Sequence, residues 1–259
     1  MTIPIEFENS GSMIRGTFFP SPGIPAIATV IFLQGLPGTE GDELICGRLA
    51  HKNINVLTFN YRGTFRSQGY FSFLNSISDI GAALKFIKGS SSLKEYQIDP
   101  EKIVLGGWSF GASLVPVGAV QNPGFSRIFA ISGRDFCSEA RKIEQDPEYA
   151  KVVSQNMESL RTPKGPINYR DDLLSELGEN RMLFDLKKLA LLLRDRHLLL
   201  IGGWDDSVIE IENFILPFYR LLKQNHSTTV MIQAFQDDHE FSKSKDKLIQ
   251  VIVRWLKKD

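Results

Sequence analysis

The strongest chemical signal in the chain is a serine between two glycines, in the sequence Gly107-Trp108-Ser109-Phe110-Gly111. Residues 103–106 are an apolar run typical of a buried strand, and residues 112–115 can open a helix. Ser109 would then lie on a sharp turn between the strand and the helix. A serine on such a turn is held in a strained backbone conformation, with its hydroxyl exposed at a helix N-terminus. The flanking glycines leave room where strand and helix nearly touch. The pattern predicts that Ser109 is a nucleophile rather than part of an ordinary glycine turn.

A serine hydroxyl is a weak nucleophile and needs a neighbouring base, which in turn needs an orienting acid. Of the four histidines, His239 follows the strand-like run 228–235, so it should emerge at the carboxyl end of a parallel sheet. His51, His197 and His226 should lie away from that end, and we expect them to be structural or surface residues. We therefore predict that His239 is the general base.

The orienting acid should follow the strand-like run 199–203, which leads directly into Asp205 and Asp206. Both carboxylates emerge at the carboxyl end of the sheet, and the strand pattern alone does not choose between them. Asp237 and Asp238 are weaker candidates because they share the loop of the histidine. An acid on the preceding strand end can face the imidazole from the far side.

Acyl transfer also requires hydrogen-bond donors for the developing oxyanion. The Phe110 backbone N–H, just after the nucleophile, is one candidate donor. The second should come from the glycine-rich loop 34–39, which follows the strand-like run 26–34. We predict the Leu36 N–H as this donor because Pro37 cannot donate. The alternative is that the loop is an ordinary strand-to-helix turn.

Two other chemistries lack the spacing they require. Residues 237–240 are two aspartates, a histidine and a glutamate, but their spacing is not specific to a metal. The glycines at 106–111 do not form G-x-G-x-x-G, and residues 35–42 lack the Gly-Lys-Ser/Thr ending of a phosphate-binding loop. We therefore expect no metal and no cofactor.

The composition restricts the partners and the compartment. Lysine plus arginine and aspartate plus glutamate both number 30 among 259 residues, which gives no support for nucleic acid or an anionic membrane surface as a partner. The two cysteines, Cys46 and Cys137, are far apart in the sequence and do not form the pattern of a disulfide framework, which fits a protein of a reducing compartment. No signal peptide and no apolar run long enough to span a bilayer is evident. We expect a cytoplasmic protein.

Strand-like and helix-like segments alternate along the chain, which predicts a mostly parallel sheet of eight strands with helices on both faces. The first two strands read as an antiparallel hairpin around residues 9–11. Strands are predicted at 3–8, 12–19, 26–34, 55–61, 103–106, 125–132, 197–202 and 228–235, and helices at 44–51, 76–88 with Ser76 as N-cap, 209–223 with a kink at Pro217, and 241–257.

Residues 134–190 interrupt this alternation with many charges, three prolines and short helical pieces. A structureless stretch of this length would be unusual in a compact domain. We predict a small helical cap over the carboxyl end of the sheet, inserted into a core of residues 1–133 and 191–259. The alternative is a set of surface helices.

These residues resemble the α/β-hydrolase superfamily over nearly the whole chain. The sequence is most similar to small serine hydrolases like the prolyl-oligopeptidase catalytic domain and the dienelactone-hydrolase-like esterases. The segments that carry the resemblance are 30–38 (strand and oxyanion loop), 60–63 and 67–69, Asp79 with Ala82-Ala83, the serine motif, and the acid loop 202–208.

The resemblance implies which aspartate is the acid. The acid loop of the family usually reads Gly-x-x-Asp-x-x-Val, which aligns Asp205 with the family acid and leaves Asp206 as runner-up. Three positions depart from the family pattern: Gln34 replaces a frequent histidine, Asn60 an aspartate and Phe65 a glycine. We expect these changes to alter local loop shape and not the triad.

The residues and the resemblance together predict a serine hydrolase with a Ser109–His239–Asp205 triad. It would cleave a small-molecule ester, thioester or small amide through an acyl-enzyme, and the resemblance adds peptidase activity to the candidates. One alternative is an acyltransferase that passes the same acyl group to an alcohol or amine. Another is a non-catalytic binding or scaffold protein of the same fold, although such proteins typically lack a triad member.

Overall fold

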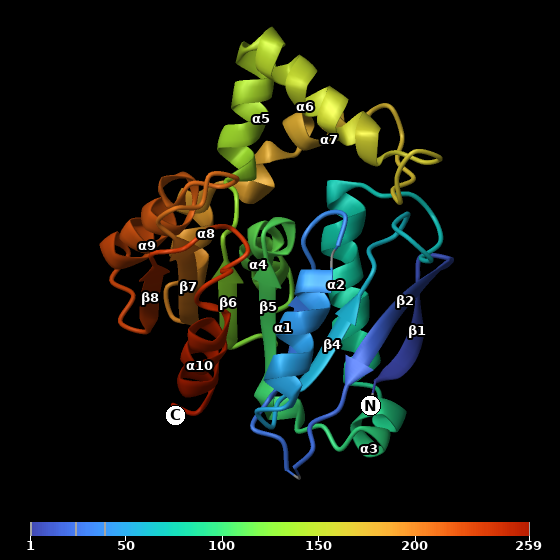
Figure 1. The fold of residues 1–259 in the computed structure, drawn as a ribbon, viewed down its shortest axis with the longest axis vertical. Coiled ribbons are helices and arrows are strands. Elements are labelled where there is room, and N and C mark those ends of the chain that lie inside the picture. The colour runs from blue at the N-terminus through green and yellow to red at the C-terminus, as the bar shows by residue number, and fades with distance from the viewer. Residues whose placement is uncertain (1, 24, 39, 259) are drawn as a thin grey trace.

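The computed structural model describes residues 2–23, 25–38 and 40–258, so that residues 1, 24, 39 and 259 lie outside the description. Within those ranges the strands form a single eight-stranded sheet in the order β1-β2-β4-β3-β5-β6-β7-β8 (Figure 1). β1 pairs antiparallel with β2 and β2 with β4, and all other pairs are parallel, which confirms the predicted sheet. The strands are β1 (Ile3–Asn9), β2 (Ser12–Phe19), β3 (Thr29–Leu33), β4 (Asn55–Phe59), β5 (Ile103–Trp108), β6 (Arg127–Ile131), β7 (His197–Gly203) and β8 (Val230–Phe235).

Helices cover both faces of the sheet and create a hydrophobic core on each side. α1 and α10 pack on one face, in front of the sheet in Figure 1, and α2, α4, α8 and α9 pack on the other. β3, β4 and β5 are therefore buried on both faces, which explains their nearly continuous apolar sequences. The helices are α1 (Glu40–Ala50), α2 (Phe73–Ile87), α3 (Ser90–Glu95), α4 (Phe110–Gln121), α5 (Phe136–Gln145), α6 (Pro147–Leu160), α7 (Leu173–Glu179), α8 (Leu186–Leu193), α9 (Ile215–Gln224) and α10 (Lys245–Leu256).

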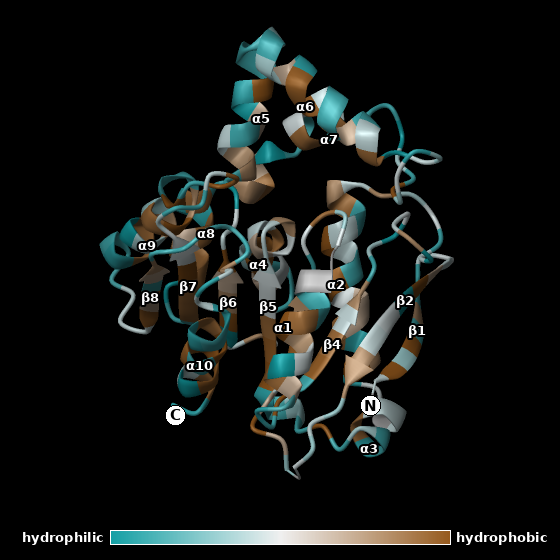
Figure 2. Ribbon diagram, in the orientation of Figure 1, coloured by the Kyte–Doolittle hydropathy of each residue, from teal (hydrophilic) through white to brown (hydrophobic). Residues whose placement is uncertain are grey.

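Three helices, α5, α6 and α7, lie above the carboxyl ends of the parallel strands, and we call them the cap helices (Figure 1). Figure 2 shows hydrophobic colours along the central strands and a mixture of hydrophilic and hydrophobic colours along the cap helices. Near its base the cap is joined to the loop after β4 by bridges of Thr64 with Ile167 and of Phe71 with Tyr169. α8 begins inside the range predicted as cap and runs past its end, and it packs against α4 and α9 on the sheet. That the cap shapes a substrate pocket stays a prediction.

Two local predictions were wrong. The N-cap of α2 is Ser72, whose Oγ accepts a hydrogen bond from the Asn75 N–H at 3.0 Å, so the helix begins one turn before Ser76. The helix expected at 209–223 is divided at Phe214 into a 3₁₀ turn, Ile211–Asn213, and α9. Pro217 lies in the first turn of α9, where its missing N–H needs no intrahelical partner, and so it does not kink the helix.

No helix in the part of the chain that the structure describes combines the length and apolarity needed to cross a bilayer.

Candidate active site

Ser109 lies between β5 and α4 with φ 55° and ψ −117°, a conformation that costs a non-glycine residue free energy. The flanking glycines are explained by backbone contacts. A Cβ on Gly107 would lie 2.6 Å from the Gly111 carbonyl carbon, and a Cβ on Gly111 would lie 2.1 Å from the Leu33 oxygen. Strand, turn and helix can therefore meet here only without side chains, as the sequence pattern predicted.

His239 faces Ser109 from the loop after β8. Its Nε2 lies 3.0 Å from Ser109 Oγ, and its Nδ1 lies 2.8 Å from Asp206 Oδ2. A proton on Nδ1, donated to the carboxylate, leaves the Nε2 lone pair directed at the hydroxyl. The ring is 9% exposed, so that its two polar contacts are largely shielded from water. The three side chains form a continuous line of hydrogen bonds from the Asp206 carboxylate through the His239 imidazole to the Ser109 hydroxyl.

The acid in this line is Asp206 and not Asp205, which corrects the register implied by the family pattern. Asp206 is buried, and its Oδ1 accepts the N–H groups of Val208 and Ile209 at 3.0 and 2.8 Å. Asp205 is exposed, and its Oδ1 accepts from Gln236 Nε2 at 2.6 Å. The turn that directs Asp206 inward therefore places the neighbouring side chain outside the site.

Asp206 remains ionised in this setting. Burial raises the pKa of its carboxyl, but the hydrogen bonds from His239 and from the Ile209 N–H outweigh burial, so the pKa lies below its ordinary value. The ionised carboxylate selects the Nδ1–H tautomer of His239 and would stabilise an imidazolium.

The histidine loop is held by its own aspartates and by the strand of the nucleophile. Asp237 accepts the N–H groups of Asp238 and Lys243, and Asp238 accepts the N–H of Ser242. The Trp108 indole N–H donates to the His239 carbonyl oxygen at 3.2 Å. The carboxylates at 237 and 238 thus organise the loop, and no group of three or more potential metal ligands occurs among the residues described.

The three other histidines lie where the sequence placed them. His51 follows α1, His197 begins β7 at its amino end, and His226 precedes β8. None of these positions is at the carboxyl edge that carries the serine.

Of the two predicted oxyanion donors, Phe110 directly follows Ser109, and Leu36 lies in a loop that approaches it. Phe110 is the first residue of α4, so its N–H has no acceptor within the helix. A Cβ on Gly35 would lie 3.6 Å from the Ser109 Cβ, which places the loop after β3 against the serine. The Gly35 N–H donates to buried Asp42 at 3.1 Å. The Leu36 N–H as second donor stays a prediction, and Thr39 of the same loop lies outside the described residues.

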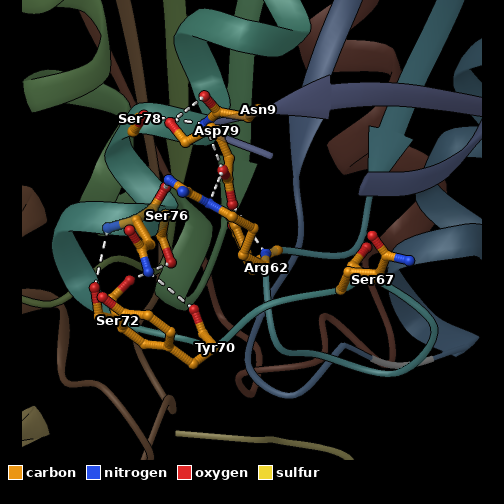
Figure 3. Close-up of polar contacts among 12 residues, drawn as sticks. Asn9, Arg62, Ser67, Tyr70, Ser72, Ser76, Ser78 and Asp79 are labelled. Atoms are coloured by element: carbon orange, nitrogen blue, oxygen red, sulfur yellow. Dashed lines mark hydrogen bonds and ion pairs between the residues drawn. The ribbon is translucent and has the colours of Figure 1, made fainter. Parts of the chain in front are cut away.

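A buried ion pair, which the sequence reasoning did not find, fixes the start of the loop after β4 (Figure 3). Arg62 Nε lies 2.7 Å from Asp79 Oδ1, and the Arg62 N–H donates to Asp79 Oδ2 at 2.9 Å. Asn9 Nδ2 donates to the same carboxylate at 2.8 Å and joins the hairpin to α2. Burial raises the pKa of Asp79, and the hydrogen bonds and charge of Arg62 partly offset that effect. Both residues lie in segments that carried the resemblance, but sequence alone gave no reason to pair them.

Arg134 lies at the start of the cap, just before α5. Its guanidinium pairs with Glu139 at 3.1 Å and donates to the Val208 carbonyl oxygen at 3.2 Å. Glu139 also accepts from the Tyr149 hydroxyl at 2.8 Å. The charge of Arg134 is therefore neutralised within the protein, and its contacts join the cap to the acid loop.

The sheet order and the serine at the end of β5 are those of the α/β-hydrolase fold, and solved structures agree. An esterase domain from Rhodothermus marinus matches with a TM-score of 0.68 and 19% identity over 98% of this chain and 97% of that one. A Pyrococcus furiosus esterase matches with a TM-score of 0.71 and 18% identity over 99% and 90%. A Pyrococcus horikoshii acylaminoacyl peptidase matches with a TM-score of 0.68 and 18% identity over 98% of this chain and 41% of that one.

The chain belongs to the prolyl oligopeptidase family, which it matches over residues 47–259. Its structure has the α/β-hydrolase fold. Among curated relatives, the protein YfhR of Escherichia coli K12 is 31% identical over 114 residues. The match covers 42% of this chain and 38% of YfhR, so that the chain spans well under half the length of this relative.

Proposed function

We propose that the protein is a serine hydrolase that cleaves a small-molecule ester, thioester or small amide through an acyl-enzyme on Ser109. The observation that carries the proposal is the line of contacts from Asp206 to His239 at 2.8 Å and from His239 to Ser109 at 3.0 Å. Family membership and the strained backbone at the serine add support.

In the first half of the reaction, Ser109 Oγ attacks the acyl carbonyl and His239 Nε2 takes the hydroxyl proton. Ionised Asp206 stabilises the resulting imidazolium. The N–H groups of Phe110 and Leu36 hold the negative oxygen of the tetrahedral intermediate. The imidazolium then protonates the leaving alcohol, thiol or amine, and the acyl group stays on the serine.

In the second half, a water replaces the leaving group. His239 takes a proton from the water as its oxygen attacks the acyl carbon, and the proton returns to Ser109 when the acid product departs. An acyltransferase would differ only in the acceptor, an alcohol or amine in place of this water. A non-catalytic role is disfavoured because the three side chains are present and aligned.

The test is the intact mass of the protein after incubation with a fluorophosphonate. We expect addition of a single phosphonyl group to the wild type, no addition to Ser109→Ala, and unchanged addition to Ser159→Ala, a control at an exposed serine of α6. Hydrolysis of p-nitrophenyl acetate should follow the same pattern. A wild type that is not labelled, or a labelled Ser109→Ala, would refute the proposal.

A further inference from the structure

Phe65 combines two properties that each cost free energy. Its φ is 47°, in the left-handed region, where a bulky aromatic residue is strained and glycine is not. Its side chain is 50% exposed, so much of a phenyl ring lies in water. A glycine at this position would avoid both costs, which indicates that the ring serves a purpose other than folding.

The ring stands beside the predicted oxyanion loop. A Cβ on Gly38 would lie 3.4 Å from Phe65 Cε2, so the edge of the ring is next to the backbone of that loop. Tyr61, a buried residue four positions before Phe65, donates its hydroxyl to the Gln34 carbonyl oxygen at 2.9 Å. Gly35, the next residue, is the one that approaches Ser109.

On its other side, Phe65 meets the base of the cap. Its N–H donates to the Pro166 carbonyl oxygen at 2.8 Å, next to the bridge of Thr64 with Ile167. A hydrogen bond from the cap thus fixes the backbone at Phe65, while about half of the side chain stays exposed. The ring lies between the loop that would hold the oxyanion and the segment that closes the base of the cap.

We propose that Phe65 is a specificity-determining residue that binds an apolar, preferentially aromatic, group of the substrate against its exposed ring. This inference rests on the proposed function, because the bound group is the part of the acyl substrate that lies over the oxyanion loop during attack. Covering the ring removes apolar surface from water and allows ring-to-ring contact. Substrates that carry such a group are therefore favoured over small esters.

The competing explanation is that the ring only packs on Gly38 to stabilise the loop. The variants Phe65→Gly and Phe65→Asn separate the two, because both residues tolerate positive φ. We expect a melting temperature equal to or above that of the wild type for both. Phe71→Ala, at a ring 1% exposed in the same loop, is the matched control and should lower it clearly. A similar fall for Phe65→Gly and Phe65→Asn would overturn the proposal.

The selectivity test compares methyl acetate, benzyl acetate and methyl phenylacetate, with acid release followed by titration. We expect Phe65→Asn to lower kcat/KM about tenfold for at least one aromatic ester, which is the effect of covering about half of a phenylalanine side chain. For methyl acetate the same variant should lower kcat/KM by less than about twofold. Phe65→Leu should retain part of the preference. Equal losses on all three esters, or no loss, would overturn the proposal.

These outcomes are distinct from failure of the proposed function. A wild type that fluorophosphonate labels at Ser109, but whose Phe65 variants keep wild-type selectivity, refutes the role of Phe65 alone. A wild type that is neither labelled nor active on any of the three esters refutes the serine hydrolase and this inference with it.

Discussion

Replacing Asp206 by asparagine removes a charge at the end of the triad and keeps the size of the side chain. In the protein, Asp206 Oδ1 accepts the N–H groups of Val208 and Ile209, and Oδ2 faces His239 Nδ1. An asparagine oxygen can keep the two backbone N–H groups, which directs its NH₂ group toward the histidine. Nδ1 must then accept, so the imidazole proton moves to Nε2 and faces the Ser109 hydroxyl.

An imidazole protonated at Nε2 cannot take the hydroxyl proton. In a serine protease, the corresponding exchange lowers kcat by about 10⁴-fold, or about 5.4 kcal/mol of transition-state stabilisation. We expect Asp206→Asn to lower kcat/KM here by about 10³- to 10⁴-fold. Asp205→Asn should change it by less than about threefold, because that carboxylate is exposed and bonds to Gln236.

The assay is hydrolysis of p-nitrophenyl acetate near neutral pH, with the melting temperature of each variant measured alongside. Both variants should remain folded, since the asparagine at 206 can still accept the two backbone N–H groups. The reasoning is refuted if Asp205→Asn is as damaging as Asp206→Asn, or if folded Asp206→Asn loses less than about tenfold.

Three further predictions concern stability. Because the pKa of Asp206 is lowered in the folded protein, its ionised form stabilises the fold, and this contribution is present above about pH 4 and lost as pH falls through the folded pKa. The free energy of unfolding should therefore fall less steeply with acid pH for Asp206→Asn than for the wild type. Identical curves of unfolding free energy against pH would contradict this. Asp79→Asn should lower the free energy of unfolding in urea by about 3 kcal/mol, because it leaves Arg62 buried without its counter-charge. The double variant Arg62→Met, Asp79→Leu should recover most of that loss, and an undiminished loss would count against the ion pair. Gly111→Ala should cost more than about 3 kcal/mol because its Cβ would lie 2.1 Å from a backbone oxygen, whereas a cost of less than about 1 kcal/mol would mean that the turn adapts.

The strands and the nucleophile turn were predictable because their signals are local. The apolar run before Ser109 and the glycines around it fix a buried strand, a turn and a helix within about ten residues. The position of His239 followed from chain direction alone, since parallel strands end at one edge. The strand order, which the sequence did not predict, brings these two side chains within hydrogen-bond distance.

The sequence pattern could not decide between Asp205 and Asp206, because they are two adjacent aspartates that follow the same strand. The geometry of the turn decides the choice, because it is the Asp206 carboxylate that accepts the backbone N–H groups of Val208 and Ile209. The pairing of Arg62 with Asp79 spans 17 residues and depends on how α2 packs beside the loop after β4. The cytoplasmic location and the lack of a nucleic-acid partner stay predictions.

Trp108 and Ser109 are neighbours in the chain, and both hold the same histidine. The indole N–H of Trp108 binds the carbonyl oxygen of His239, and the hydroxyl of Ser109 meets its ring. The position of His239 relative to Ser109 is therefore held by two contacts with a single dipeptide, rather than by the relative placement of two independent loops. Separating His239 from Ser109 would therefore require the loss of both contacts.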